Sequence, residues 1–205
     1  MDIIGAIKTR RSIRDYKKRE VSFSLLKKIV ECGLHAPSSK NSQPWNFLII
    51  KNKKIINQIA DILINSKNLD AEPSDPQTGK IRAGFMSSIK ASGYIIKGTP
   101  SIIVVENTCP FSHQRKEVMK SKFKGNAING HDSEVISIGC AIQNICLAAH
   151  GLGLSSVIIA DVVAEEKIIK NLLGIKGDLI AVLPIGYPPY KPGPKKVNPS
   201  YRLIK

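Results

Sequence analysis

The chain reads DSEVISIGCAIQNICLAAH from Asp132 to His150, and this is the longest apolar segment among its 205 residues. In a helix built from this segment, apolar side chains would cover nearly every face. A helix that is hydrophobic all round must be buried on all sides. We therefore expect a central helix within one domain, with part of its surface covered by a second subunit.

Helices and strands alternate irregularly around this segment, which favours an α+β fold over a doubly wound one. Asp2 and Ser22 are residue types that cap helix N-termini, so they predict helices that end near Thr9 and before Pro37. The apolar patterns predict further helices at 53–64 and 164–173, and buried strands at 47–50, 101–105, 155–160 and 179–187.

Two polar excursions, at about 66–98 and 107–131, interrupt this order and show poor helical periodicity. Long excursions inside a compact domain are more often functional than structural. No domain linker is visible, so we expect a single domain over 1–205, with both excursions near the active site.

The formal net charge is +15, which raises the possibility of a nucleic-acid-binding protein. The lysines are scattered along the chain, however, and aromatic residues make up only 5%, which leaves few platforms for stacking bases. A lysine-rich surface that confers solubility is the simpler explanation. The same positive field would attract anionic substrates or cofactors.

Several classes of protein are excluded by what the sequence lacks. No apolar run is long enough to cross a membrane, and the start, Met1-Asp2-Ile3-Ile4, is unlike a signal peptide. We therefore expect a cytoplasmic protein. The four cysteines form no C-x-x-C pair and the histidines show no ligand spacing, so we expect no metal site.

The first motif with chemical meaning is RRSIR at 10–14. In an extended chain Arg10, Ser12 and Arg14 would point to one side and Arg11 to the other. Arginine side chains suit phosphate oxygens because their planar forks donate paired hydrogen bonds. Taken alone, the cluster is also explained by a solvated basic turn.

The second motif is PSSKNSQPW at 37–45, a stiff polar loop between two prolines. Asn41 and Gln43 each offer a donor and an acceptor, which can match the imide edge of a flavin ring. The alternative is a helix-to-strand turn in which Trp45 anchors the core. Together with the arginine cluster, the loop predicts a site for a phosphorylated aromatic cofactor.

These two motifs resemble the N-terminal signature of the nitroreductase-like FMN flavoprotein family. The resemblance continues through AIQNICLAAHGLG at 141–153 and LPIGYP at 183–188, and it ends in a basic tail. It implies a nitroreductase-like fold in which helices flank a central, mostly antiparallel sheet. It also implies an intertwined homodimer with two FMN sites at the subunit interface.

The resemblance further implies a role for particular residues. Arg10 and the tail would hold the FMN phosphate with help from Arg11 and Ser12, and Arg14 would face the pyrimidine edge of the ring. The flavin would carry the chemistry, so no catalytic side chain is assigned. The remaining cofactor-binding residues implied are Pro37, Ser38, Ser39, Asn41 and Gln43 in the loop, Val157, Ile158 and Ile159 on the third strand, and Lys195 and Lys196 in the tail.

The function implied is an FMN-dependent oxidoreductase that takes electrons from NADH or NADPH. It would pass them by ping-pong hydride transfer to a small-molecule acceptor, such as a nitroaromatic compound, a quinone or another conjugated molecule. Two alternatives stay open: a flavin-binding protein that stores or fragments flavin, and a basic nucleic-acid-binding module without a cofactor.

Overall fold

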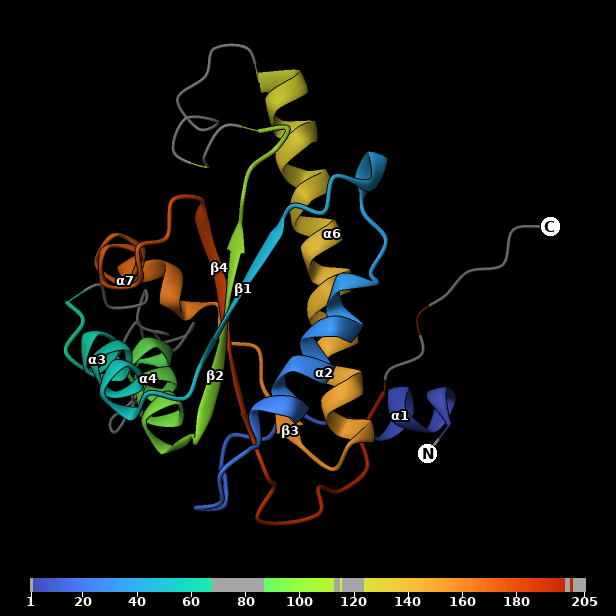
Figure 1. Ribbon diagram of the computed structural model, residues 1–205, viewed down its shortest axis with the longest axis vertical. Coiled ribbons are helices and arrows are strands. Elements are labelled where there is room, and N and C mark those ends of the chain that lie inside the picture. Colours follow the sequence, from blue (N-terminus) through green and yellow to red (C-terminus); the bar gives the residue numbers. More distant parts are fainter. Residues whose placement is uncertain (1, 68–86, 113–114, 116–123, 198–199, 201–205) are drawn as a thin grey trace, which may run out of the picture.

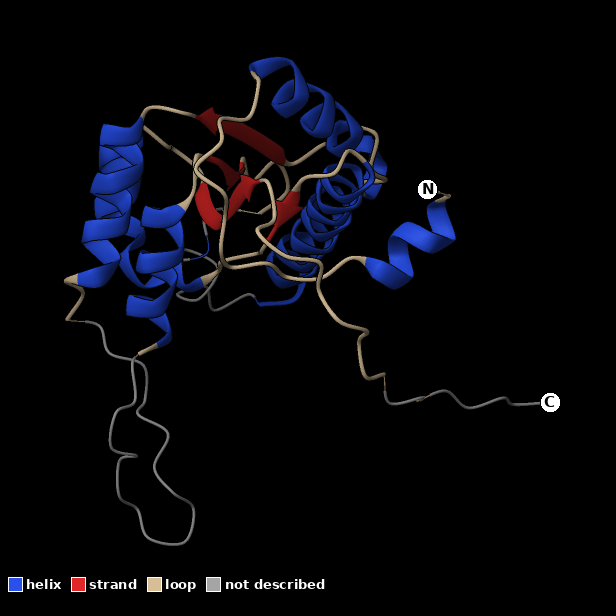
Figure 2. Cartoon of the chain, turned by 90° about the horizontal axis from the view of Figure 1, so that it is seen from below, coloured by secondary structure: helices blue, strands red, loops and turns tan. Residues whose placement is uncertain are grey.

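The fold is a sheet between two layers of helices, as the computed structural model shows for residues 2–67, 87–112, 115, 124–197 and 200 (Figures 1 and 2). Within these residues the sheet has four antiparallel strands in the order β1-β2-β4-β3. The strands are β1 (Trp45–Ile50), β2 (Ser101–Asn107), β3 (Ser155–Ser156) and β4 (Asp178–Gly186). This confirms the α+β class and the antiparallel sheet.

The helices divide between the two faces of the sheet (Figure 1). Helices α2 (Phe23–Leu34) and α6 (Lys124–Gly151) pack on one face. The other face is covered by α3 (Lys53–Ile64), α4 (Ser88–Gly98) and α7 (Glu166–Leu173). The described residues also include α1 (Ile3–Thr9) and the short 3₁₀ turns η1 (Ser39–Asn41) and η2 (Asp161–Glu165).

Strand β2 explains why the core has two parts. Its side chains alternate, so that Ile103 and Val105 join the cluster under α2 and α6. Ile102 and Val104 join the cluster under α3, α4 and α7. All residues of β2 are buried because helices cover both faces of the sheet, and its four central residues, 102–105, form a continuous apolar run.

The predicted N-caps are confirmed. The side chain of Asp2 accepts a hydrogen bond from the Gly5 amide at 2.6 Å, and that of Ser22 accepts one from Leu25 at 3.3 Å. Helix α3 has the predicted bounds. Each side chain satisfies an amide that has no partner within the helix, so these boundaries follow from local chemistry.

Other boundaries differ from the prediction. The polar excursion at 66–98 contains helix α4, whose buried face includes Ser92 and Gly93, and these two residues obscured its apolar period. Residues 68–86 of that excursion and much of the 107–131 excursion lie outside the described residues. The described part of the second excursion includes the start of α6, at Lys124, well before the predicted start.

The strand predicted at 155–160 and the helix predicted at 164–173 are each less regular than expected. The third strand pairs with β4 only at Ser155 and Ser156, and it then makes an isolated bridge between Ile159 and Val182. The helix predicted from residue 164 is divided into the turn η2 and helix α7.

Helix α6 is not enclosed on all sides by its own chain. Ile138, Ala141 and Ile145 are fully buried against the core, while Ile136 is 68% exposed and Val135 is 39% exposed. Helix α1 stands away from the body beside the end of α6 (Figure 2), and its side chains Ile3, Ile4 and Ile7 are exposed. Within the described residues no helix is both long and apolar enough to cross a membrane.

The contact between α3 and α4 gives a first test of the fold. A Cβ at Gly93 would lie 2.8 Å from the Ala60 carbonyl oxygen and 3.0 Å from the Ile64 amide nitrogen, which are backbone atoms that cannot turn aside. We expect Gly93→Ala to lower the free energy of unfolding by about 1–3 kcal/mol in urea titrations.

The matched control is Gly98→Ala on the same helix, where a Cβ would meet nothing within 4 Å. This change should leave stability equal or raise it by up to about 1 kcal/mol, because alanine loses less backbone entropy than glycine. Equal effects at both positions would contradict the close helix contact.

Candidate functional site

A cavity of about 400 Å³ lies where the chain leaving α1 meets the end of α6, strand β3 and the segment after β4. Its size is in the ordinary range for a small-molecule site. Its wall is basic, and none of the described residues that line it is acidic. The lining residues are Arg10, Arg11, Ile13, Lys17, His150, Gly153, Leu154, Ser155, Ser156, Pro188, Pro189, Tyr190, Lys191 and Pro192.

The arginine cluster is attached to β3 by backbone pairing. The Ile13 amide donates to the Ser156 carbonyl oxygen at 3.2 Å, and Ser12 forms a parallel bridge with Ser156. Ile13 is buried. Arg10 and Arg11 both line the cavity, and Ser12 does not.

Arg14 is exposed and lies outside the lining of the cavity. Arg11 connects two segments of the chain: its Nη1 donates to the carbonyl oxygens of Lys8 at 2.9 Å and Arg10 at 2.7 Å, and its Nε donates to Gly193 at 3.2 Å. It therefore fixes the end of α1 to the proline-rich tail, while Arg10 has no such bond among those described.

The tail lysines expected at the phosphate, Lys195 and Lys196, are exposed and do not line the cavity. Lys17 and Lys191 line it instead. Sequence reasoning missed both, since lysines occur throughout the chain and none of them carries a local signature. The Lys17 amide donates to the Tyr187 carbonyl oxygen at 2.9 Å, so a contact between distant segments brings Lys17 here.

The residues expected on the third strand continue from Ser156 away from the cavity. Val157 and Ile159 are buried, and Ile159 exchanges backbone hydrogen bonds with Val182 at 3.0 and 2.9 Å. Ile158 between them is 49% exposed. Of these three residues, the chain thus presents only Ile158 to solvent.

The polar loop before β1 is held in an unusual conformation. Lys40, Asn41 and Gln43 have φ values of 52°, 53° and 46°, in the left-handed region that residues other than glycine rarely adopt. The Ser38 hydroxyl accepts a bond from the Gln43 amide at 3.0 Å, and Gln43 Nε2 donates to Asn41 Oδ1 at 3.3 Å. Such strain often accompanies a functional loop.

Trp45, which follows the loop, is part of the core beneath α2 and α6, as the alternative interpretation of this residue predicted. The loop itself is attached to α6 where the Ser39 amide donates to Ser137 Oγ at 3.3 Å. His150, in the last turn of α6, lines the basic cavity. At 1.5 Å per residue, Ser137 and His150 are about 20 Å apart along the helix. The two motifs therefore do not meet within one chain.

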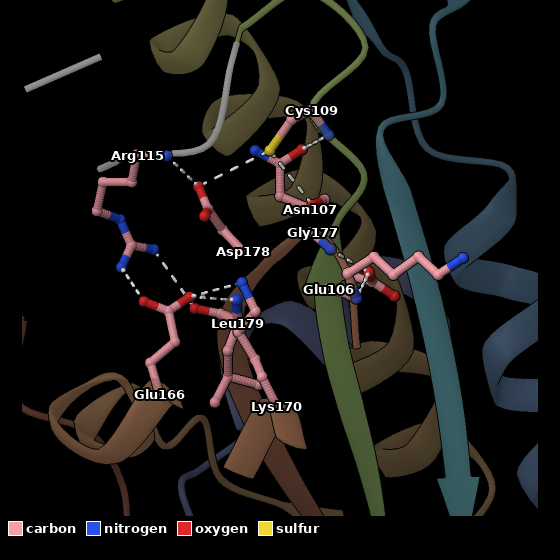
Figure 3. A network of polar contacts seen from close by, with 10 residues as sticks. Glu106, Asn107, Cys109, Arg115, Glu166, Lys170, Gly177, Asp178 and Leu179 are labelled. Atoms are coloured by element: carbon pink, nitrogen blue, oxygen red, sulfur yellow. Dashed lines mark hydrogen bonds and ion pairs between the residues drawn. The ribbon is translucent and has the colours of Figure 1, made fainter. Parts of the chain in front are cut away.

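A second group of titratable side chains surrounds the start of β4 (Figure 3). Asp178 Oδ2 accepts from the Arg115 amide at 2.7 Å and lies 3.7 Å from Cys109 Sγ. Burial, followed by the charge of Asp178, raises the pKa of the Cys109 thiol to about 11. At neutral pH this cysteine is therefore a protonated thiol, which is a poor nucleophile.

The other carboxylates of this group also hold backbone. Glu106 Oε1 accepts from the amides of Lys176 at 3.1 Å and Gly177 at 2.7 Å (Figure 3). Glu166 accepts from the Leu179 amide at 2.8 Å and pairs with Arg115 at 3.5 Å. Because these acids are engaged with main-chain donors, we interpret the group as structural.

Glu134 on α6 completes the structural group, and it is fully buried. Its carboxylate accepts bonds from the amides of Phe111 at 2.7 Å and Ser112 at 2.9 Å, from the Ser112 hydroxyl at 2.5 Å and from Asn107 Nδ2 at 2.9 Å. Burial alone would raise the pKa of Glu134, but these hydrogen bonds outweigh it and hold the pKa below its ordinary value.

Comparison with known proteins identifies the class. The model of the nitroreductase family matches residues 7–187, which is most of the chain. The chain therefore belongs to the nitroreductase family of oxidoreductases, and the resemblance inferred from the motifs is confirmed.

A relative from Methanothermobacter thermautotrophicus, named "Putative NADH dehydrogenase/NAD(P)H nitroreductase", is 30% identical over 99% of this chain and 86% of its own length. Among solved structures, a BluB-like flavoprotein from Clostridium difficile 630 has a TM-score of 0.73 and 24% identity, with both chains fully covered. An FMN-dependent nitroreductase from Clostridium difficile R20291 has a TM-score of 0.64 and 24% identity, over 94% of this chain and 91% of its own. The two structures share the fold.

The buried carboxylate of Glu134 gives a prediction about pH. Because its pKa is lowered in the folded state, Glu134 stabilises the fold at pH values above its ordinary pKa, and this contribution is lost as the pH falls through the folded-state value. At pH 7 we expect Glu134→Gln to lower the free energy of unfolding by about 2–3 kcal/mol. All four partners of the Glu134 carboxylate are donors, so the NH2 group of a glutamine would face another donor instead of an acceptor.

Urea titrations between pH 7 and pH 3 should show the difference between Glu134→Gln and the wild type becoming smaller as the pH falls. Glu20→Gln is the control, since Glu20 is 89% exposed and pairs only with Lys51 in the described structure. A constant difference across this pH range would contradict the ionised state of Glu134.

Proposed function

We propose that this chain is an FMN-dependent NAD(P)H oxidoreductase and that the basic cavity binds the phosphate end of FMN. The main support is the cavity wall, where Arg10, Arg11, Lys17 and Lys191 come together and no described lining residue is acidic. A phosphate monoester carries nearly two negative charges at neutral pH, and guanidinium groups bind its oxygens in paired hydrogen bonds.

The flavin ring would lie beyond the phosphate, along the edge formed by Val157, Ile158 and Ile159. This edge follows directly from Ser156, which lines the cavity and pairs with the arginine segment. FMN, when bound, supplies the transfer of two electrons between donor and acceptor. The chain orients the ring, and the charge of Arg14 at its pyrimidine edge would stabilise negative charge that collects there on reduction.

The complete site would need a second copy of the chain. The polar loop that carries Asn41 and Gln43 is about 20 Å from the cavity along α6, so the loop of a partner is better placed to cover the ring. Exposed apolar side chains favour such a dimer: Ile136 on α6 and three isoleucines on α1. A groove between α1 and the ends of α2 and α6 has a volume of about 490 Å³ and a largely apolar lining.

The electron donor and the electron acceptor would bind one after the other at the same face of the flavin ring. NADH or NADPH would reduce the flavin and leave, and a flat conjugated acceptor such as a nitroaromatic compound or a quinone would then bind at the same face. The cationic wall of the cavity and the overall charge of +15 would favour anionic donors and acceptors.

The direct test is an anaerobic titration. Purified protein, reconstituted with FMN and gel-filtered, should show flavin absorbance that bleaches on addition of one equivalent of NADH or NADPH, and a quinone or nitroaromatic compound should restore it. Bound FMN that neither donor bleaches would instead indicate a storage or flavin-fragmenting protein. A chain that cannot be reconstituted at all would contradict every flavin function and favour the nucleic-acid alternative.

Arg10→Ala tests where the phosphate lies. Because the guanidinium group of Arg10 makes no hydrogen bond among those described, its loss should weaken FMN binding about 10- to 100-fold, with little change in stability. The FMN affinity of Arg10→Lys should lie between those of the wild type and Arg10→Ala. Lys54→Ala removes the same charge from α3 on the other face of the sheet and should bind FMN like the wild type; fluorescence quenching of FMN measures all four proteins.

The same variant can test the shared site. A second chain carrying Asn41→Gly and Gln43→Gly loses the loop side chains but keeps residues that tolerate positive φ. Each altered chain alone should bind FMN poorly. When the two are co-expressed and isolated with separate tags, one of the two sites in the mixed dimer is intact, so the pair should bind about half the FMN of the wild type. No recovery would mean that the loop does not cross to a partner.

A further inference from the structure

His150 is the one histidine among the described residues that line the basic cavity. It lies in the last turn of α6 and is partly buried. The sequence shows no ligand spacing around it, and only the fold brings it beside Arg10 and Arg11.

The hydrogen bonds of Thr9 determine which ring nitrogen of His150 carries its proton. Thr9 Oγ1 donates to the Gly5 carbonyl oxygen at 2.6 Å and lies 2.8 Å from His150 Nε2. A hydroxyl has a single hydrogen; when it points to Gly5, the hydrogen between Thr9 and His150 belongs to Nε2. A neutral His150 therefore holds its proton on Nε2 and keeps a lone pair on Nδ1.

The surroundings of His150 disfavour a second proton on the ring. Burial, followed by the charges of Arg10 and Arg11, lowers the pKa of His150 below its ordinary value. The C-terminal end of α6 acts in the opposite direction, since it favours a cation. The titratable and charged groups around His150 come from three segments. They are Arg10, Arg11 and Lys17 after α1, Tyr190 and Lys191 after β4, and Cys146 one turn earlier on α6.

We propose that His150 takes up one proton from solvent when the FMN phosphate binds, and then holds the phosphate as an imidazolium. This rests on the proposed function. The dianionic phosphate offsets the two arginines, and the new proton on Nδ1 is donated to a phosphate oxygen while Nε2 keeps its bond to Thr9. His150 is thus a further cofactor-binding residue, and Thr9 is the positioning residue that orients the ring.

Two consequences distinguish proton uptake by His150 from a purely structural role of this side chain. FMN affinity rises as the pH falls from about 8.5 to 6.5, because a proton is bound together with the cofactor; below about pH 6 the phosphate itself takes up a proton. Riboflavin, which lacks the phosphate, shows no such dependence. The residue therefore contributes to the choice of the phosphorylated cofactor.

The test is isothermal titration calorimetry of the whole protein with FMN at pH 7, in two buffers of different ionisation enthalpy. The difference between the apparent enthalpies gives the number of protons taken up. For the wild type we expect about half a proton or more per FMN, and none with riboflavin. His150→Gln keeps an amide that can donate to Thr9 but cannot titrate, so it should take up none and bind FMN about 3- to 10-fold more weakly.

Thr9→Ser and Thr9→Val form a matched pair. Serine keeps the hydroxyl and should keep the proton uptake, whereas valine should reduce it. If His150→Gln does not fold, NMR titration of the wild-type histidine rings gives the same answer: FMN should raise the apparent pKa of one of the four histidines.

The outcomes separate this proposal from the proposed function. Tight FMN binding with no proton uptake, or with equal uptake in wild type and His150→Gln, would overturn the role of His150 and leave the oxidoreductase intact. Failure of the wild type to bind FMN would overturn both.

Discussion

The packing of α6 against the sheet determines where every part of the candidate site lies. Its buried side chains Ile138 and Ile145 rest on the core, and α2 approaches so closely that a Cβ at Gly33 would lie 2.7 Å from Ile145 Cγ1. The middle of α6 holds the polar loop through Ser137, and its C-terminal end carries His150 into the basic cavity. The helix keeps the loop and the cavity apart within one chain.

The electrostatics of the cavity follow from the same arrangement. The C-terminal end of a helix carries a partial negative charge, and α6 directs this end toward the place where we locate a phosphate. Two other segments add positive charge to the cavity wall, through Arg10 and Lys191 among others. Away from this cavity, the acids Glu134 and Asp178 are engaged with backbone amides and hold the backbone in place.

The pattern of residues predicted some elements well because their signals are local. Helix α3 was found within its bounds, since its apolar residues recur at helical spacing and Asn52 caps it. Helix α4 was missed because the face that approaches α3 needs small residues, and Ser92 and Gly93 break the apolar period. The prediction also chose Lys195 and Lys196 for the phosphate, whereas Lys17 and Lys191 line the cavity.

By itself the sequence determined the α+β class, the caps of the first helices, the family and the basic character of the candidate site. These depend on residue type and short-range spacing, which a single chain displays directly. Only the tertiary structure decided which cations share one wall, that His150 joins them with its Nε2 at 2.8 Å from Thr9 Oγ1, and that the two motifs contact α6 at its C-terminal end and at its middle. Those features depend on contacts between segments far apart in the chain, and their geometry follows from packing around the sheet.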